Sequence, residues 1–218
     1  MFDRGTQALE LQNFILELIE KNEVMIVRGN HEDLMMDLLH GWESGSYLQY
    51  HHHANGTINT VLQLTRSRPD DLVNDPDSIR RKLLGNPCIQ VIIPGMLDYY
   101  ETDHYIFTHG WIPCKYVSFN PYSKEYISIE DWRKADMGKW SQACWINGME
   151  AAHGGVIEKG KTIVCGHWHV SFGHSHYEGD GGEFDHHPNF MPYYGEGIIA
   201  LDACTPISGK INCIVIED

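Results

Sequence analysis

The sequence has no C-x-x-C pair, although its 218 residues include six cysteines. Because these cysteines are scattered singly, a disulfide framework is disfavoured and reduced thiols in a cytoplasmic protein are expected. No run of about 18 apolar residues occurs, so we expect no membrane span and no membrane partner. No basic segment followed by an apolar stretch indicates a secretion signal.

Positive charge is also scarce. The chain has 16 Lys and Arg against 30 Asp and Glu, for a net charge of −14. Such an acidic surface repels nucleic-acid phosphate, so no nucleic-acid partner is expected. Histidine is plentiful, with 14 residues, and it is the commonest metal ligand. Composition otherwise indicates one globular domain covering residues 1–218.

Hydrophobic periodicity predicts an α/β fold in which strands run into loops and helices. The segment 43–60 is expected to be loop followed by the start of a helix, with His51, His52 and His53 as a solvated tract. The segment 173–196 is expected to be a long functional loop. Helices are predicted at 6–21, 32–42 and 77–85, strands at 24–27, 105–109 and 161–165, and two C-terminal strands in 197–203 and 210–218 around a turn at 206–209.

Three predicted strands end in a similar way, at a small residue or turn next to histidine. They lead into RGNHED, HGWIP and GHWHV. A glycine beside each histidine allows the backbone to turn sharply and keeps the approach to a ligand uncrowded. Packing alone does not explain three such ends, so we expect the histidines to converge on a functional site.

The residue types at these ends suit a metal ion. Imidazole nitrogen and an asparagine oxygen together favour borderline divalent ions such as Mn, Fe or Zn. We assign Asn30, His109 and His167 to one ion, with His169 nearby. His31 would then remain available as an acid.

Four motifs in order, FDRG, RGNHE, THG and GHWH, resemble those of the calcineurin-like metallophosphoesterases. The similarity is greatest to the bacterial branch of the serine/threonine protein phosphatases, and it extends over the whole chain. The resemblance implies a four-layer αββα sandwich around a two-metal site that hydrolyses phosphate esters, with Mn as the expected metal and Fe or Zn as alternatives.

The resemblance also implies roles for individual residues. Asp3 corresponds to the carboxylate that orients the general acid His31, and we expect the two within about 2.6–3.2 Å. Arg4 corresponds to the arginine that holds the substrate phosphate. His169 corresponds to a ligand of the first ion. One departure is the stretch 145–147, where an asparagine stands in place of a second phosphate-binding arginine.

The family's D-x-H-G element and the bridging Asp before FDRG are absent from the sequence. We therefore expect a fold without its first strand and helix, at most one metal, and little activity in this chain. Substrates would be phosphoproteins or small phosphoesters. Two alternatives are a nucleotide or dinucleoside-polyphosphate hydrolase and a fragment without catalytic activity. An oligomer that forms through the flank lacking the first strand and helix is a further alternative.

Overall fold

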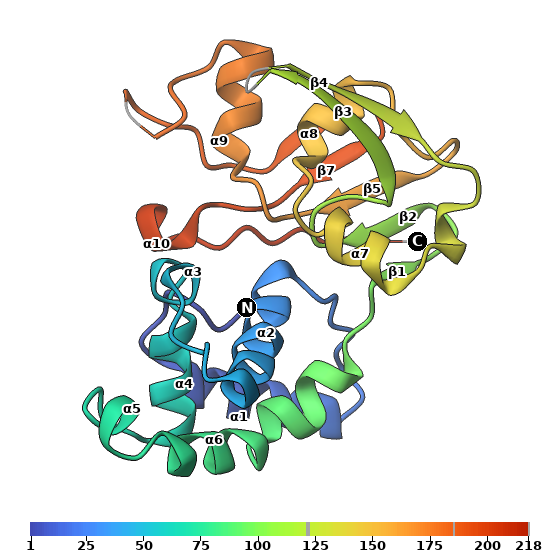
Figure 1. Ribbon diagram of the computed structural model, residues 1–218. Helices are drawn as coiled ribbons and strands as arrows, with labels where there is room; N and C mark the ends of the chain where they lie inside the picture. Colours follow the sequence, from blue (N-terminus) through green and yellow to red (C-terminus); the bar gives the residue numbers. More distant parts are fainter. Residues whose placement is uncertain (121–122, 185, 218) are drawn as a thin grey trace. The chain divides into compact units, whose positions relative to one another are not determined.

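The chain folds into two compact units, Met1–Leu97 and Asp98–Asp218. The computed structural model (Figure 1) describes residues 1–120, 123–184 and 186–217. Together they form a mixed α/β structure, as the sequence predicted, with a five-stranded sheet and a separate two-stranded sheet among the described residues. That residues 1–218 form a single domain stays a prediction.

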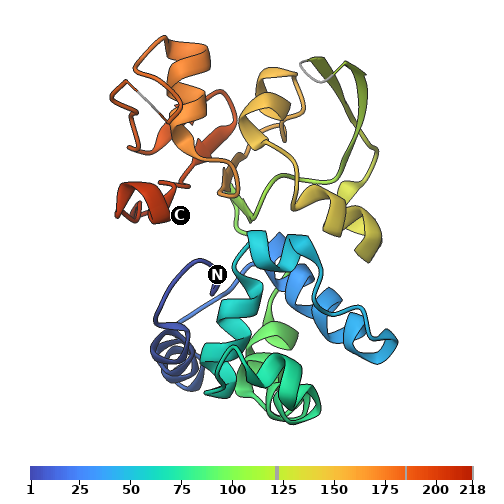
Figure 2. The ribbon, with the colours of Figure 1, turned by 60° about the vertical axis from the view of Figure 1, so that its left-hand side comes forward.

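The first unit is built of helices. α4 and α6 contact one another, and Figure 2 shows them as neighbouring teal and green helices. The predicted helices are present, although α2 begins two residues earlier than expected. The bounds are α1 Ala8–Glu20, α2 Asn30–Ser44, α3 Tyr50–Ala54, α4 Thr57–Thr65, α5 Asp71–Asn74, α6 Pro76–Leu84, the single π turn η1 Cys88–Ile92 and the 3₁₀ turn η2 Ile93–Gly95.

Apolar side chains from several helices form the core of this unit, with Leu38, Val61 and Ile79 fully buried. The predicted strand at 24–27 is wrong. Of residues 24–27, all of which the structure describes, only Val27 makes a β-bridge, and it is a parallel pair with Leu97. An apolar run forms a strand only where another strand lies beside it, and this segment has one bridge and no ladder.

The second unit contains the five-stranded sheet in the order β1-β2-β5-β7-β6. The central pairs β2–β5 and β5–β7 are parallel, and the two outer pairs are antiparallel. The strands predicted at 105–109 and 161–165 are confirmed. The bounds are β1 Tyr99–Glu101, β2 Tyr105–Thr108, β5 Thr162–Cys165, β6 Tyr193–Gly195, β7 Ile198–Ala200, and the helices η3 Trp132–Lys134, α7 Met137–Ala143, α8 Gly148–His153, α9 Val170–Gly173, η4 His174–Glu178 and α10 Thr205–Ser208.

Two features of this unit differ from the expectation. β3 (Cys114–Asn120) and β4 (Ser123–Ser128) form an antiparallel hairpin that the sequence did not predict. The expected last strand is absent from the described residues 210–217, where Ile211 and Val215 are more than four-fifths exposed. α10 stands where a turn was expected, and Asp218 lies outside the described residues.

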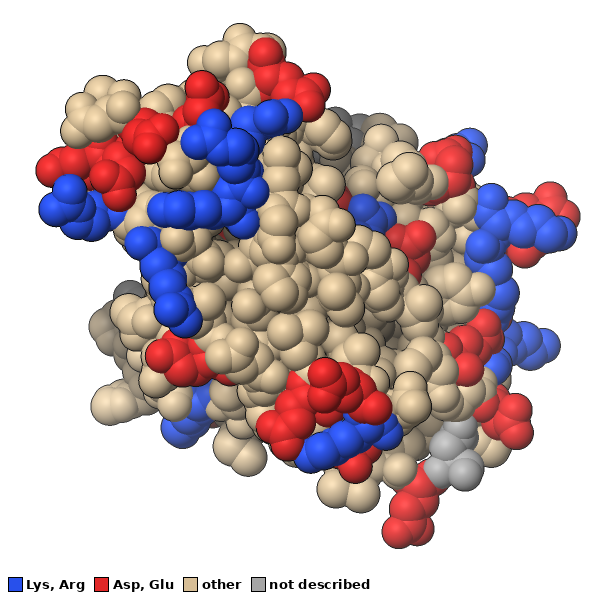
Figure 3. Space-filling view, turned by 90° about the horizontal axis from the view of Figure 1, so that it is seen from below, with Lys and Arg blue, Asp and Glu red and all other residues tan. Residues whose placement is uncertain are grey.

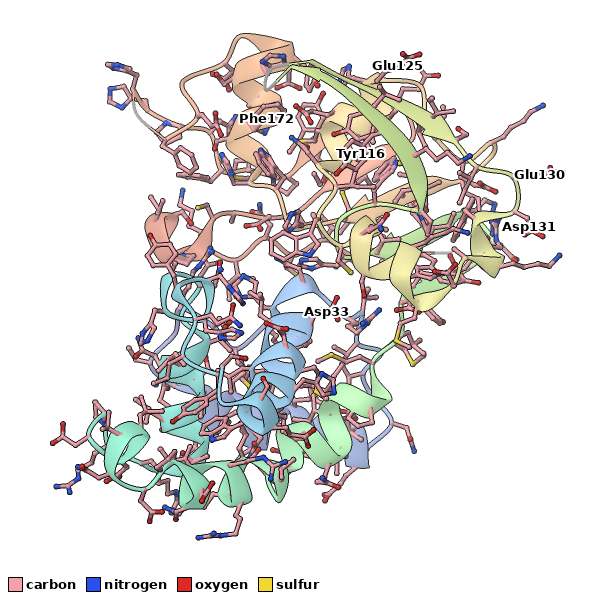
Figure 4. All side chains as sticks on the ribbon, in the orientation of Figure 1. Asp33, Tyr116, Glu125, Glu130, Asp131 and Phe172 are labelled. Atoms are coloured by element: carbon pink, nitrogen blue, oxygen red, sulfur yellow. The ribbon has the colours of Figure 1, made fainter. Side chains whose placement is uncertain are left out.

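The segment 173–196 is only partly the loop that was expected. It starts with the end of α9 and the π turn η4, and it ends in β6. Residue 185 lies outside the described residues. Phe172 of α9, labelled in Figure 4, stacks on His176 with ring centroids 5.1 Å apart. Contacts of this kind between aromatic rings order a segment that has no hydrophobic periodicity.

The surface drawn in Figure 3 carries Lys and Arg side chains beside Asp and Glu side chains. On that face the two signs of charge are therefore interspersed. Among the described residues, no helix is both long enough and apolar enough to cross a membrane.

Candidate functional site

Asp3 and His31 form a hydrogen-bonded pair in the first unit. His31 is the second residue of α2, and its Nδ1 lies 2.8 Å from Asp3 Oδ2. This distance confirms the expected contact. Because a carboxylate only accepts hydrogen bonds, Nδ1 carries a proton and Nε2 faces away from Asp3.

Two threonines of α4 hold the Asp3 carboxylate from the other side. Thr57 donates to Oδ2 at 2.7 Å and Thr60 donates to Oδ1 at 2.6 Å. Burial alone raises the pKa of Asp3, but the hydrogen bonds from His31, Thr60 and Thr57 outweigh burial, and the net pKa is lowered. Asp3 is therefore a buried, fully bonded carboxylate that fixes the ring of His31.

Arg4 follows in an uncommon backbone conformation, with φ at 69°. Its Nη2 donates to Asn55 Oδ1 at 3.1 Å, and the side chain is exposed. Gly56 packs against Arg4 so closely that a Cβ there would lie 2.8 Å from the Arg4 backbone nitrogen. A left-handed conformation at a non-glycine residue persists only where neighbours enforce it, and such positions concentrate at functional sites.

Asn30 is the first residue of α2 and is buried, with 2% of its surface exposed. The start of this helix is held in place by its neighbours. Glu32 Oε2 accepts from the backbone N–H of Gly29 at 2.9 Å. Asp33, which projects from the first turn of α2 in Figure 4, pairs with Arg28 at 2.5 Å. The RGNHE motif is thus a turn into a helix that is held by a hydrogen bond and an ion pair.

His109 and His167 lie side by side in the second unit. They follow β2 and β5, which are neighbouring parallel strands, and Gly166 N donates to His109 O at 2.8 Å. The ring centroids are 5.1 Å apart. The carboxyl ends of parallel strands meet at one edge of a sheet, which is where ligands bind in open α/β sheets.

The backbone around these histidines is closely packed or strained. His167 has φ at 65°, which costs an L-residue about 1–2 kcal/mol. Gly110 lies against the backbone of Ala143 and Cys144, so a Cβ at Gly110 would collide with carbonyl oxygens. The glycine expected to free space for a ligand is instead needed for packing behind His109.

His169, the N-cap residue of α9, already has a partner within its own unit. Its Nε2 lies 2.8 Å from Glu183 Oε1, and its ring stacks on Phe184 at 4.2 Å. A carboxylate bonded to one imidazole nitrogen is the usual arrangement behind a metal-bound histidine, whose other nitrogen binds the ion. His169 as a metal ligand stays a prediction.

Asn147, at the position where the family has an arginine, caps α8. Its Oδ1 accepts from Met149 N at 3.1 Å and Glu150 N at 3.4 Å, and the residue is 3% exposed. Its Nδ2 has no hydrogen-bond partner but is buried, so the side chain presents no exposed donor to a bound phosphate. The second phosphate-binding group implied by the family is therefore missing from this position.

A groove opens next to the segment that follows His109. It has a volume of about 870 Å³ and is lined by both strands of the β3–β4 hairpin, and its charged lining residues are Lys115, Lys139 and Glu130. Nothing in the sequence identified this groove.

The structure brings the candidate residues together within each unit. Convergence of the two groups on one site stays a prediction. Asp3, Arg4, Asn30 and His31 belong to the first unit, and His109, His167 and His169 belong to the second.

Three residues that position Asp3 and His169 were not identified from the sequence. Thr57 and Thr60 bond to Asp3, and Glu183 bonds to His169. Threonines three residues apart at the start of a helix share one face, which was the available signal for the first two. Nothing in the sequence around Glu183 pointed to His169.

Comparison with protein-family models, with curated proteins and with solved structures found no match to this chain. The resemblance to the metallophosphoesterases therefore depends on the sequence motifs alone.

Proposed function

We propose that this protein hydrolyses phosphate esters with the help of divalent metal ions, in the manner of a serine/threonine-phosphatase-like phosphomonoesterase. The observation that carries the proposal is the Asp3–His31 hydrogen bond of 2.8 Å between residues 28 positions apart. Spacing gives no reason for that contact, whereas the similarity of FDRG and RGNHE to the family motifs implies it. The αββα sandwich and the cytoplasmic location belong to the same proposal.

The donor set in the second unit fits a metal. His109 and His167 lie next to one another at the ends of parallel strands, and two imidazoles suit Mn, Fe or Zn. These histidines would hold one ion, and the family motif adds Asn30 to them. When bound, such an ion polarises a phosphoryl oxygen and activates water. The three ligands are neutral, so we expect weak binding.

His31 is the proton donor in this proposal. Asp3 holds the proton on Nδ1, and the opposite nitrogen, Nε2, then carries the proton that passes to the leaving alkoxide. The His31 side chain is 18% exposed, which leaves it accessible to substrate. Arg4 would bind the phosphate, since a guanidinium bonds two phosphate oxygens at once. Asn55 positions Arg4 until substrate arrives.

The test is turnover of aryl phosphates at saturating Mn²⁺ and high protein concentration, because slow turnover is expected. His31→Asn should lower kcat by about 100-fold or more, the usual contribution of a general acid. The fall in kcat should be larger for aryl phosphates whose phenol is a poorer leaving group. Asp3→Asn should show the same trend more weakly.

His53→Gln is the matched control, since His53 is an exposed histidine of the same unit. Its turnover should equal that of the unmodified chain. A deficit in His31→Asn that is the same for good and poor leaving groups would contradict the acid role. Absence of any Mn²⁺-dependent turnover in the unmodified chain would contradict the proposed activity.

A further inference from the structure

Three side chains of the first unit that have no part in the proposed hydrolysis gather at one point. Asp37 of α2 and the consecutive histidines His51 and His52 of α3 have ligand atoms within 4.8 Å of one another. Asp37 Oδ2 lies 3.1 Å from the Nε2 atoms of both histidines. The histidine tract expected to be a solvated loop is therefore a helix that directs two rings at one carboxylate oxygen.

The surroundings of His52 point to a cation at this place. His52 is fully buried, and its Nδ1 lies 2.9 Å from the Tyr47 carbonyl oxygen. A carbonyl only accepts, so Nδ1 carries the proton and the Nε2 lone pair of a neutral ring faces Asp37. Two lone pairs 3.1 Å apart repel each other unless a proton or a metal ion lies between them.

The carbonyl that fixes His52 is itself held in place. The Tyr47 ring stacks on Trp42 with centroids 4.3 Å apart, and its hydroxyl donates to Leu72 O at 3.2 Å. An Nδ1–H bonded to a backbone carbonyl is the usual support of a histidine that binds metal through Nε2. The support that a metal ligand needs is therefore present in the residues around His52.

We propose that Asp37, His51 and His52 form a zinc site that is separate from the candidate phosphatase site. Tetrahedral zinc with bonds of about 2.0–2.1 Å separates its ligand atoms by about 3.3–3.4 Å, close to the 3.1 Å between Asp37 Oδ2 and each histidine. Two imidazoles and one carboxylate suit zinc. Asp37 and His51 are partly exposed, so water can complete the coordination.

Such a site would tether α3 to α2. The chain leaving α3 carries Asn55, which donates to His51 O at 2.8 Å and accepts from Arg4. Zinc bound at one end of α3 therefore stabilises the corner that positions Arg4 at the other end. Neither the site nor the tether depends on the proposed hydrolysis.

The experiment is titration of the full chain with ZnCl₂, followed by NMR of the histidine ring nitrogens and by calorimetry. One equivalent of zinc should shift the Nε2 signals of His51 and His52. Asp37→Asn and His51→Gln, which alter partly exposed side chains, should each weaken this binding at least about tenfold. His53→Gln, on the same helix, should bind zinc as the unmodified chain does.

His109→Gln separates this site from the second unit, since it removes a candidate ligand there. The His51 and His52 shifts should persist in that variant, and their loss would overturn the assignment. Unshifted His51 and His52 nitrogens in the unmodified chain would overturn it too, since a proton rather than zinc would then bridge His52 and Asp37. The assignment would also be overturned if Asp37→Asn bound zinc as tightly as the unmodified chain does.

Discussion

Replacement of Thr60 by valine tests whether the buried Asp3 carboxylate is held as the structure indicates. Valine keeps the shape of threonine and removes only the hydroxyl that donates to Asp3 Oδ1 at 2.6 Å. Thr60 is fully buried, so water cannot replace the lost donor. A hydrogen bond to a charged group contributes about 1.5–3 kcal/mol to stability, and we expect Thr60→Val to cost that much.

Thr65→Val is the matched control on the same helix. Thr65 is also buried, but its hydroxyl donates at 2.8 Å to a neutral acceptor, the carbonyl of Val61. Loss of a bond between neutral groups should cost about 0.5–1.5 kcal/mol. Urea unfolding followed through the indole N–H signal of Trp42 reports on the first unit, because the other five tryptophans lie in the second.

The pH dependence provides the decisive comparison. Because the pKa of Asp3 is lowered from 3.8 in the folded chain, its stabilisation is complete above that value and is lost as the pH falls through the lower folded value. The cost of Thr60→Val should shrink over the same range, while that of Thr65→Val should not. Equal costs at neutral pH, or a Thr60→Val cost that does not change with pH, would refute this account.

Three further predictions concern the second unit and the phosphate. Gly110→Ala should destabilise the second unit by about 1–3 kcal/mol through overpacking, whereas Gly166→Ala, whose Cβ would lie 3.8 Å from its nearest neighbour, should not lower the melting temperature. Hydrogen bonds from Arg133, opposed by burial, lower the pKa of Glu101 to about 2. Glu101→Gln should therefore destabilise that unit at neutral pH, and urea midpoints should converge as the pH falls from 4.5 to about 2. Arg4→Lys should raise KM for an aryl phosphate more than it lowers kcat, because lysine cannot bond two phosphate oxygens in parallel; an unchanged KM would contradict phosphate binding.

The His109–His167 pair could be predicted because local rules were sufficient. Each histidine follows a short β-branched or aromatic run, and β2 and β5 turned out to be neighbours. Parallel neighbours end at the same edge, so the histidines meet there. The contact between His109 and His167 therefore followed from strand assignment and one topological rule.

The strands predicted at 24–27 and 210–218 failed for one physical reason. A run of apolar, β-branched residues shows that a segment tolerates extended backbone, but a strand also needs a partner that supplies hydrogen bonds. Val27 pairs with a single residue, and Val215 is 90% exposed. At β3 no strand was predicted although one is present. Its residues include Lys115 and Asn120 and lack the apolar alternation of a half-buried strand.

The Asp3–His31 contact came from the motif resemblance, since no periodicity relates residues 28 positions apart. The surrounding contacts explain why the motif needs its neighbours. Asp3 accepts from Thr57 and Thr60, and Arg4 donates to Asn55, so one corner between α3 and α4 restrains both residues. That double restraint accounts for Arg4 remaining at φ 69°. Loosening the α3–α4 corner would therefore affect two groups at once, the carboxylate that orients His31 and the arginine proposed to bind phosphate. The FDRG motif alone does not reveal this coupling.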